Sequence, residues 1–204
     1  MSTVHTADLV IAGFGGQGVL FAGQVLAHAA LDAGLQTTWM PSYGPEMRGG
    51  TANCTVIVAD GPIGSPVVGR PQAVIALNLP SLDRFEALVA PGGLLVVNAS
   101  LVDRAVVRTD LDVVVILGDD VAAELGHPKL TNVVLLGALL ARHPGLRALP
   151  ALDLERVGAT LAHVLPERHR RLLGANQAAL ARGAELAGAA TAVGAAPLRT
   201  RPTR

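Results

Sequence analysis

The stretch that decides the fold runs from Asp8 to Ala33 and reads DLVIAGFGGQGVLFAGQVLAHAALDA. A short Val/Leu/Ile segment is followed at once by a cluster of glycines, and then by a helical pattern that begins at Val19. Small residues recur on one stripe of that helix, at Gly23, Ala27 and Ala30, which suits close packing on a sheet. The stretch therefore predicts a strand, a tight turn and a helix lying against the strand.

Short apolar segments alternate with helical patterns along the rest of the chain. We expect further strands over residues 35–40, 54–59, 73–77, 94–98 and 113–117. We expect helices over residues 80–89, 119–125, 131–141, 153–164 and 167–189. Strands that are apolar on both faces and alternate with helices are typical of a parallel sheet with helices on both sides. The sequence thus predicts an α/β fold: a three-layer α/β/α arrangement with a mostly parallel, Rossmann-like sheet and C-terminal helices.

Local signals refine this arrangement. The strand over 54–59 has no helix before it, so we expect it to run antiparallel. Gly34 is expected to end the first helix, and Ser81 to cap the helix over 80–89. The helix over 131–141 is apolar nearly all round, which predicts that it is deeply buried or covered by a partner.

Length and composition indicate the number of domains and the kinds of partner that the protein can have. With 204 residues, one α/β domain over residues 1–190 is expected, followed by a flexible tail over 191–204 that is rich in Ala, Gly, Pro and Arg. Half of the residues are hydrophobic and only 16% are charged. A surface so short of charge indicates obligate assembly with partner chains, although a large alanine-rich monomer core explains it equally well. The 16 basic and 16 acidic residues cancel, which argues against binding to nucleic acid or to an anionic membrane.

Nothing in the sequence indicates a metal centre or a catalytic side chain. The single cysteine, Cys54, lies in a predicted strand without a basic neighbour in sequence, so we expect a buried, inert thiol. The six histidines are scattered and lack the spacing of metal ligands. No apolar run reaches the length of a membrane span, and the N-terminus lacks a signal-peptide pattern, so a cytoplasmic location is expected.

Gly13, Gly15 and Gly18 have the spacing of a dinucleotide-binding turn, between a strand and a helix N-terminus. Such a turn lets backbone N–H groups approach an anion at the positive end of a helix. A dinucleotide site should also have an acidic residue at the end of the second strand, and here that strand ends in WMP at 39–41. This absence weakens the NAD interpretation. The alternative is that the glycines only permit a tight turn and close packing of the helix on the sheet.

The segment from Pro41 to Gly50 reads PSYGPEMRGG, and its two prolines and three glycines predict a shaped loop. It places Tyr43, Glu46 and Arg48 at the carboxyl end of a strand, where open α/β sheets hold their sites. The alternative is that Glu46 and Arg48 pair with each other and only brace the loop.

Two asparagines lie at the ends of apolar elements. Asn78 ends an apolar strand, and we expect it to bond the adjacent loop backbone rather than a ligand. Asn132 opens an apolar helix and is interpreted as part of the helix start.

Together these segments resemble the gamma subunit family of 2-oxoacid:ferredoxin oxidoreductases, which includes pyruvate, 2-oxoglutarate, branched-chain 2-oxoacid and indolepyruvate enzymes. The resemblance spans nearly the whole chain, and its most specific part is the PSYGPEMRGG segment. The segments that carry it are GFGGQGV at 13–19 with Ala22-Gly23, PSYGPEMRGG at 41–50, Leu77-Asn78, TNVVLLGA at 131–138 and ANQAALARG at 175–183.

The resemblance implies a gamma subunit, or its fused-domain equivalent, of a complex that decarboxylates a 2-oxoacid with coenzyme A. The products are an acyl-CoA, carbon dioxide and reduced ferredoxin. It also implies that this chain carries no redox cofactor of its own. Thiamine diphosphate and iron–sulfur (4Fe-4S) clusters are expected on alpha and beta partner subunits or on a ferredoxin-like subunit, so the chain alone is expected to be inactive.

The same resemblance places the candidate site at the glycine turn and the following loop, which we expect to face the partner subunits and to frame the coenzyme A or thiamine site. The candidate residues are Gly13, Gly15, Gly16, Gln17, Gly18, Ser42, Tyr43, Glu46, Arg48, Gly49 and Gly50. The planar guanidinium of Arg48 suits a phosphate or a carboxylate. Two other interpretations stay open: a free-standing dinucleotide-binding protein, and a scaffold whose loops only pack.

Overall fold

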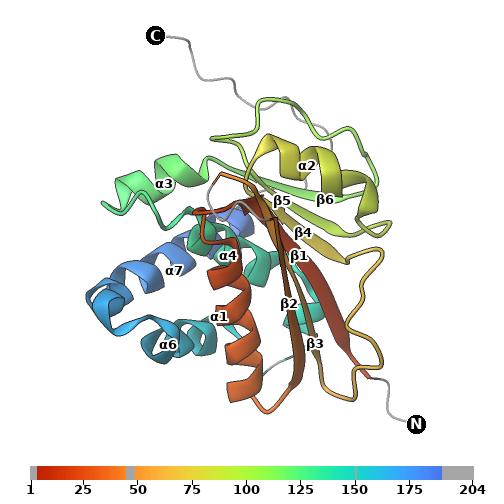
Figure 1. Cartoon of the computed structure of the whole chain (residues 1–204), viewed down its shortest axis with the longest axis horizontal. Helices are drawn as coiled ribbons and strands as arrows, with labels where there is room; N and C mark the ends of the chain where they lie inside the picture. Colours follow the sequence, from red (N-terminus) through yellow and green to blue (C-terminus); the bar gives the residue numbers. More distant parts are fainter. Residues whose placement is uncertain (1–3, 45–48, 150, 190–204) are drawn as a thin grey trace.

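The computed structural model describes residues 4–44, 49–149 and 151–189. Within these residues, six strands form one sheet in the order β2-β3-β1-β4-β5-β6 (Figure 1). The strands are β1 (Thr6–Phe14), β2 (Gln36–Tyr43), β3 (Thr51–Ala59), β4 (Ala73–Ala76), β5 (Leu94–Asn98) and β6 (Asp112–Ile116). β1, β4, β5 and β6 pair in parallel, whereas β3 is antiparallel to both β1 and β2. The predicted α/β fold, with a mostly parallel sheet and an antiparallel third strand, is confirmed.

Helices cover both faces of the sheet. They are α1 (Val19–Asp32), α2 (Leu79–Phe85), α3 (Gly118–Glu124), α4 (Thr131–Arg142), α5 (Pro144–Arg147), α6 (Leu154–Val164) and α7 (Leu173–Ala189), with the short 3-10 helices η1 (Glu86–Leu88) and η2 (Glu167–Leu172). α1, α4, α6 and α7 lie on one face, whereas α2 lies on the other (Figure 1). Because α1 follows β1 on one face and α2 follows β4 on the opposite face, the topological switch point falls between β1 and β4.

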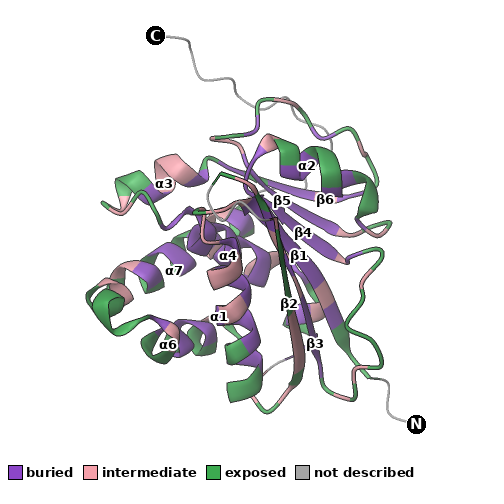
Figure 2. Cartoon of the chain, viewed as in Figure 1, coloured by how far each residue is buried: buried purple, intermediate pink, exposed green. Residues whose placement is uncertain are grey.

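The sheet is buried on both faces by two separate hydrophobic cores (Figure 2). Leu9 and Ile11 of β1 face the larger core, under α1, α4, α6 and α7, while Val10 and Ala12 face the smaller core beneath α2. This alternation is the two-residue period of a strand. Since both faces are covered, the central strands carry apolar residues at nearly every position. No helix among the described residues combines the length and the apolar character that a membrane span requires.

α4 is buried by α7, which belongs to the same chain. A Cβ on Gly137 would lie 1.9 Å from the carbonyl oxygen of Leu180, and a Cβ on Gly183 would lie 1.8 Å from that of Val134. Glycine at both positions lets the two backbones touch. Two of the segments that carry the family resemblance are therefore the two sides of one helix crossing. The prediction of a deeply buried helix is confirmed, with α7 as its cover.

α1 packs on β3 and β2 through the predicted stripe of small residues. A Cβ on Gly23 would lie 2.5 Å from Cys54 Sγ and 2.9 Å from Trp39 Nε1, so only glycine fits between the helix and these side chains. The helix ends as expected, because Gly34 takes a φ of 75° directly after the C-cap residue Ala33.

Three local predictions were wrong. β2 continues through Pro41 to Tyr43 instead of stopping before the proline, because an edge strand needs ladder hydrogen bonds on one side only. α2 begins at Leu79, and its cap is Asn78, which accepts a hydrogen bond from the N–H of Ser81; Ser81 itself is not the cap. The single helix expected over 167–189 is divided into η2 and α7.

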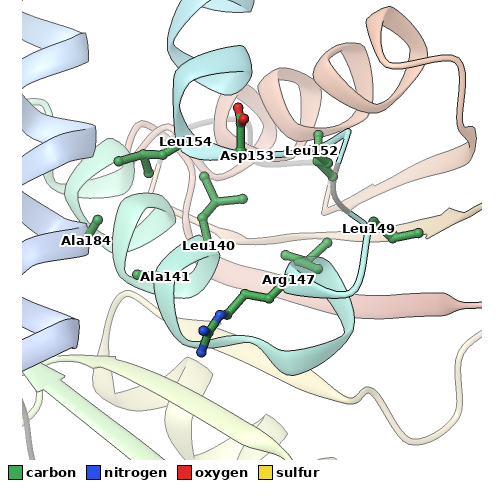
Figure 3. Close-up of a pocket in the computed structure, with 9 residues that line it drawn as sticks. Leu140, Ala141, Arg147, Leu149, Leu152, Asp153, Leu154 and Ala184 are labelled. Carbon is green, nitrogen blue, oxygen red and sulfur yellow. The ribbon is translucent and has the colours of Figure 1, made fainter.

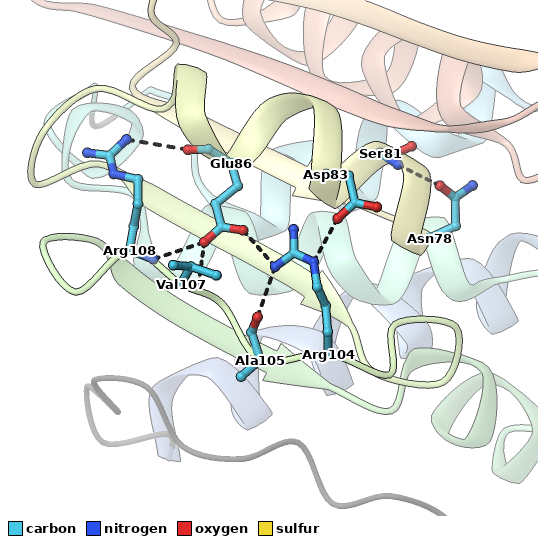
Figure 4. A network of polar contacts seen from close by, with 8 residues as sticks. All are labelled: Asn78, Ser81, Asp83, Glu86, Arg104, Ala105, Val107 and Arg108. Atoms are coloured by element: carbon cyan, nitrogen blue, oxygen red, sulfur yellow. Dashed lines mark hydrogen bonds and ion pairs between the residues drawn. The ribbon is translucent and has the colours of Figure 1, made fainter.

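An ionic network fastens the segment over residues 99–111 to α2 and η1 (Figure 4). The carboxylate of Glu86 is buried and accepts hydrogen bonds from Arg104 Nη1 at 2.8 Å and from the N–H of Arg108 at 2.9 Å. Arg104 also donates to Asp83 at 2.7 Å. Burial raises the pKa of Glu86, but the hydrogen bonds from Arg108 and Arg104 outweigh it, so the pKa of Glu86 lies below its ordinary value. The network holds the 99–111 segment over the smaller core.

Candidate functional site

The candidate site lies at the carboxyl edge of the sheet, where the turn after β1 leads into α1. Gly16 and Gly18 have φ angles of 100° and 74°, which side chains disfavour. Gly13 has no room for a side chain, because a Cβ there would lie 2.7 Å from Gln17 Oε1. A Cβ on Gly18 would lie 2.4 Å from Asn132 Nδ2. The turn and its packing therefore require these glycines even without a ligand.

Asn132, the second residue of α4, supports the turn from the next helix. Its Nδ2 donates to the carbonyl oxygen of Gly18 at 3.0 Å. Its Oδ1 is buried and has no hydrogen-bond partner among the described residues. The predicted place of Asn132 at a helix start is confirmed, and the structure adds a contact to the turn.

The hairpin between β2 and β3 lies directly against the glycine turn. The N–H of Gly15 donates to the carbonyl oxygen of Gly50 at 2.9 Å, and the N–H of Gly49 donates to the carbonyl oxygen of Gly15 at 3.5 Å. Gly49 has a φ of 79°, a left-handed conformation that favours glycine. The two motifs singled out in the sequence therefore form one structural unit.

A groove of about 380 Å³ lies between this turn, the start of α1 and the hairpin. We call it the turn groove, and it is lined by Phe14, Gly15, Gly16, Gly18, Val19, Leu20, Phe21, Tyr43 and Ala52. Tyr43 is 58% exposed. Within the described part of the chain, no side chain caps α1 and the groove lining holds no charged residue. The first N–H groups of α1 are therefore placed to bind an anion.

Gln17 spans the carboxyl ends of β1 and β4, at the switch point of the sheet. Its Oε1 accepts hydrogen bonds from the N–H of Phe14 at 2.6 Å and from Asn78 Nδ2 at 2.9 Å. Asn78 Oδ1 in turn accepts from the N–H of Ser81 at 3.0 Å, which confirms that Asn78 bonds the adjacent backbone. In open α/β sheets this crevice is where a pyrophosphate binds. Here the side chain of Gln17 occupies it.

The site offers shape and backbone donors rather than reactive side chains. Cys54 is fully buried beneath α1, and burial raises the pKa of its thiol to about 12. The prediction of an inert thiol is confirmed. Among residues 4–44, 49–149 and 151–189, no group of three or more His, Cys, Asp or Glu side chains could hold a metal ion. The turn groove can therefore bind apolar surface and an anionic group, and its described lining residues include no paired acid and base.

The structure describes the positions of most of the predicted site residues. The residues that it brings together are Gly13, Gly15, Gly16, Gln17, Gly18, Tyr43, Gly49 and Gly50. Ser42 lies apart from the groove: it pairs with Asn53, whereas Tyr43 pairs with Ala52, and successive strand residues point to opposite faces. Glu46 and Arg48 lie outside the described residues, so the roles expected for them stay predictions.

A second polar cluster at the same edge was not anticipated from the sequence. Asn98 is fully buried, and its Nδ2 donates to the carbonyl oxygen of Leu77 and to Asp119 Oδ1, each at 3.2 Å. Thr131 Oγ1 donates to the same Asp119 oxygen at 2.8 Å. A signal was present, since Asn98, like Asn78, is a polar residue at the end of an apolar strand. The cluster ties the ends of β4 and β5 to α3 and α4.

The fold and the site define a three-layer α/β protein whose glycine turn and hairpin enclose an apolar groove at the sheet edge. The chain belongs to the pyruvate ferredoxin/flavodoxin oxidoreductase family, whose profile matches residues 8–186. The family expected from the sequence motifs is confirmed.

Relatives of known name are subunits of oxidoreductases and synthases. The chain is 40% identical over 131 residues to the ketoisovalerate oxidoreductase subunit VorA of Methanothermobacter marburgensis, covering 64% of this chain and 27% of VorA. It is 33% identical over 135 residues to the 2-oxoglutarate synthase subunit KorC of Methanocaldococcus jannaschii, covering 65% of this chain and 72% of KorC. The chain thus spans little more than a quarter of the length of VorA.

Solved structures agree with this assignment. The gamma subunit of a keto/oxoacid ferredoxin oxidoreductase from Geobacter sulfurreducens superposes with a TM-score of 0.73 at 28% identity, covering 90% of this chain and 99% of that one. The 2-oxoglutarate:ferredoxin oxidoreductase of Magnetococcus marinus, with 2-oxoglutarate, coenzyme A and succinyl-CoA bound, superposes with a TM-score of 0.80 at 21% identity. The match covers 93% of this chain and 32% of that one, and at this identity it shows the fold alone.

Proposed function

We propose that this chain is the gamma component, as a separate subunit or a fused domain, of a 2-oxoacid:ferredoxin oxidoreductase. The complex converts a 2-oxoacid and coenzyme A into an acyl-CoA and carbon dioxide, and ferredoxin takes up the electrons. Residues 1–190 form the gamma-type domain. Support comes from the family and from the Geobacter gamma subunit, which is matched along 99% of its own length.

The observation that carries the proposal is the pairing of the glycine turn with the hairpin around the turn groove. The groove joins the N-terminus of α1, which no described side chain caps, to the apolar walls formed by Phe14, Phe21 and Tyr43. Coenzyme A combines phosphates with an extended arm that is partly apolar. Phosphates bind helix N-termini, and apolar walls bury the arm, so the groove fits this substrate. We assign the turn groove to coenzyme A at an interface with the partner subunits.

The redox groups of the complex belong to other chains in this proposal. One cysteine in the whole sequence cannot supply the four thiolates that a 4Fe-4S cluster requires. Thiamine diphosphate and the clusters are carried by the alpha and beta subunits or by a ferredoxin-like subunit, and the complex works in the cytoplasm. The gamma component contributes a shaped backbone surface.

The alternative of a free-standing dinucleotide-binding protein is less well supported by the geometry. In a dinucleotide site the second parallel strand lies beside the first and holds the ribose at its carboxyl end. Here the antiparallel β3 lies beside β1, and β2 is displaced to the sheet edge.

The proposal is tested by co-expressing the chain with its candidate alpha and beta subunits. Viologen reduction that depends on both a 2-oxoacid and coenzyme A is measured. We expect Tyr43→Ala to raise the KM for coenzyme A about tenfold, with kcat and assembly little changed, because an apolar wall of the groove is lost. Val107→Ala is the matched control, since Val107 is 77% exposed on the 99–111 segment over the opposite face of the sheet. Equal KM values for the two variants would argue against coenzyme A in the turn groove.

Ligand binding by the isolated chain distinguishes a gamma component from a free-standing dinucleotide-binding protein. The chain is titrated by calorimetry with NAD, FAD and coenzyme A. Micromolar binding of NAD or FAD without any partner would overturn the gamma assignment in favour of a dinucleotide-binding protein. Absence of turnover by the chain alone is expected.

A further inference from the structure

Positive charge gathers in η2, although the chain as a whole is neutral. η2 reads ERHRRL, and its three arginines lie within the four positions 168–171. Glu167 is the one carboxylate between residues 156 and 184. Three arginines and one glutamate give η2 a formal net charge of +2 with the histidine neutral, whereas the net charge of the 204 residues is zero. An uneven distribution of this kind creates a local positive potential on a neutral protein.

The arginines of η2 are on the surface. Arg168, Arg170 and Arg171 are exposed, and no residue of η2 is buried. η2 joins α6 to α7 at the outer corner of the helical layer, at the left of Figures 1 and 2. In a 3-10 helix, side chains three positions apart are eclipsed, so Arg168 and Arg171 lie on one face. The two guanidinium groups can therefore act together on one partner.

The same arginines lack the carboxylate partners that other arginines have. In the portion that the structure describes, ion pairs with carboxylates are made by Arg104, Arg108, Arg142 and Arg182. Arg168 instead donates to His169 Nε2 at 3.2 Å. No described carboxylate lies within ion-pair distance of Arg168, Arg170 or Arg171. Like charges this close repel one another, so the cluster costs stability that an anionic partner offsets.

The surroundings of η2 favour a protein partner over a small molecule. Small-molecule sites are concave, whereas η2 is a connection without a buried residue. Exposed positions next to it in the sequence carry small side chains, at Ala162 on α6 and at Gly174 and Ala178 on α7. A broad surface can therefore approach the arginines closely.

We propose that the arginines of η2 dock the ferredoxin that accepts the electrons, an inference that rests on the proposed function. An iron–sulfur cluster held by four cysteine thiolates is anionic, because the thiolates and sulfides outweigh the charge of the irons. A small protein built around such clusters brings this negative charge to the encounter. Guanidinium groups suit its carboxylates, since they bind them through paired hydrogen bonds.

Docking at η2 gives the gamma component a role without a redox group of its own. It holds the ferredoxin by its surface, while clusters on the other chains deliver the electrons. Attraction between oppositely charged surfaces raises the association rate and orients the partner, and salt screens it. Turnover with ferredoxin therefore depends on η2, whereas turnover with a small artificial acceptor does not.

The test uses the complex co-expressed for the proposed function, with a small 4Fe-4S ferredoxin or methyl viologen as the acceptor. Arg168→Glu and Arg171→Glu are combined in one variant. We expect the KM for ferredoxin to rise at least tenfold at about 20 mM salt, and the difference to shrink to about twofold at about 500 mM. Turnover with methyl viologen, which is a dication, and the KM for coenzyme A are expected to stay unchanged, because neither requires η2.

Arg70→Glu combined with Arg147→Glu is the matched control, since it changes the net charge by the same amount at another place. Both arginines are exposed, and neither lines the turn groove. Arg70 lies between β3 and β4. Figure 3 shows the guanidinium of Arg147, at the end of α5, extending away from Leu149 and Leu152. We expect the KM for ferredoxin in this control to stay within about twofold of the original value.

The outcomes separate this inference from the proposed function. Equal KM values for ferredoxin in the two double variants, or a rise that salt does not reduce, would overturn the docking site, while viologen turnover leaves the proposed function intact. Loss of viologen turnover in the η2 variant would assign its arginines to folding or assembly, and would also overturn the docking site. No turnover with either acceptor in the unaltered complex would refute the proposed function, and this inference with it.

Discussion

At the scale of single residues, Gln17 decides what the glycine turn can hold. Its Oε1 accepts hydrogen bonds from the N–H of Phe14 and from the amide of Asn78, at the point where the sheet switches direction. Gln17→Ala leaves both donors without this acceptor. We expect the free energy of unfolding to fall by about 1–3 kcal/mol, as measured by urea denaturation. An unchanged midpoint would mean that water replaces the side chain at no cost.

Gln17→Glu is the matched change, because a carboxylate accepts the same two hydrogen bonds. It also places negative charge beside the N-terminus of α1, which stabilises a helix but repels a phosphate. We expect stability within about 1 kcal/mol of the original chain and at least a tenfold loss of coenzyme A affinity in the assembled complex. A stable variant with full affinity would show that no phosphate approaches this turn.

His143 is the residue whose titration is expected to control acid stability. It is buried, its Nδ1 accepts a hydrogen bond from the N–H of Leu146, and burial lowers its pKa to about 4. In the unfolded chain the pKa of His143 is near 6.5. Between pH 6.5 and 4 the imidazole is therefore protonated in the unfolded state but stays neutral in the folded state. Stability is therefore expected to fall between pH 6.5 and 4, by up to about 3 kcal/mol, and to be unaffected by this group above pH 6.5.

His143→Asn removes the titration and keeps a side chain that can cap α5. The loss of stability between pH 6.5 and 4 is expected to shrink in this variant, in denaturation series run across that range. The exposed His169→Asn change serves as the control. Identical pH profiles for the two variants would contradict the role of His143.

At the scale of elements, the crossing of α4 and α7 leaves no room for a side chain at Gly137 or Gly183. Gly183→Ala would drive a Cβ against the carbonyl oxygen of Val134, and backbone cannot move aside as a side chain can. We expect a loss of about 3 kcal/mol or more, or failure to fold, judged by thermal unfolding. Gly174→Ala on the same helix meets nothing within 4 Å, so it is expected to be neutral or stabilising by up to about 1 kcal/mol. Similar losses in both variants would point to helix α7 as a whole rather than to the crossing.

At the scale of the whole molecule, both cores are closed by elements of this chain. α7 covers α4, and the network around Glu86 holds the 99–111 segment over the smaller core. We therefore expect the isolated chain to fold without partners and to unfold in one cooperative transition, followed by circular dichroism. Binding to alpha and beta subunits adds stability only to the folded state, so they are expected to raise the midpoint. A chain that gains cooperative structure only with its partners would refute this.

The strands and helices were predictable wherever local periodicity was strong, as in β1, α1 and the buried α4. Predictions failed where two local rules compete. Proline predicts the end of a strand at Pro41, but an edge strand tolerates proline. Ser81 and Asn78 are both good capping residues, and only the path of the chain into α2 decides that Asn78 accepts the bond.

The sequence by itself determined the family, the alternation of strands and helices, and the two motifs of the candidate site, because periodicity and turn chemistry are short-range properties. Only the tertiary structure decided that Gly15 pairs with Gly50, that Gln17 occupies the switch point, and that α7 covers α4. These contacts join residues distant in the chain. They depend on the order of the strands, and it is the antiparallel course of β3 beside β1 that carries the hairpin to the glycine turn.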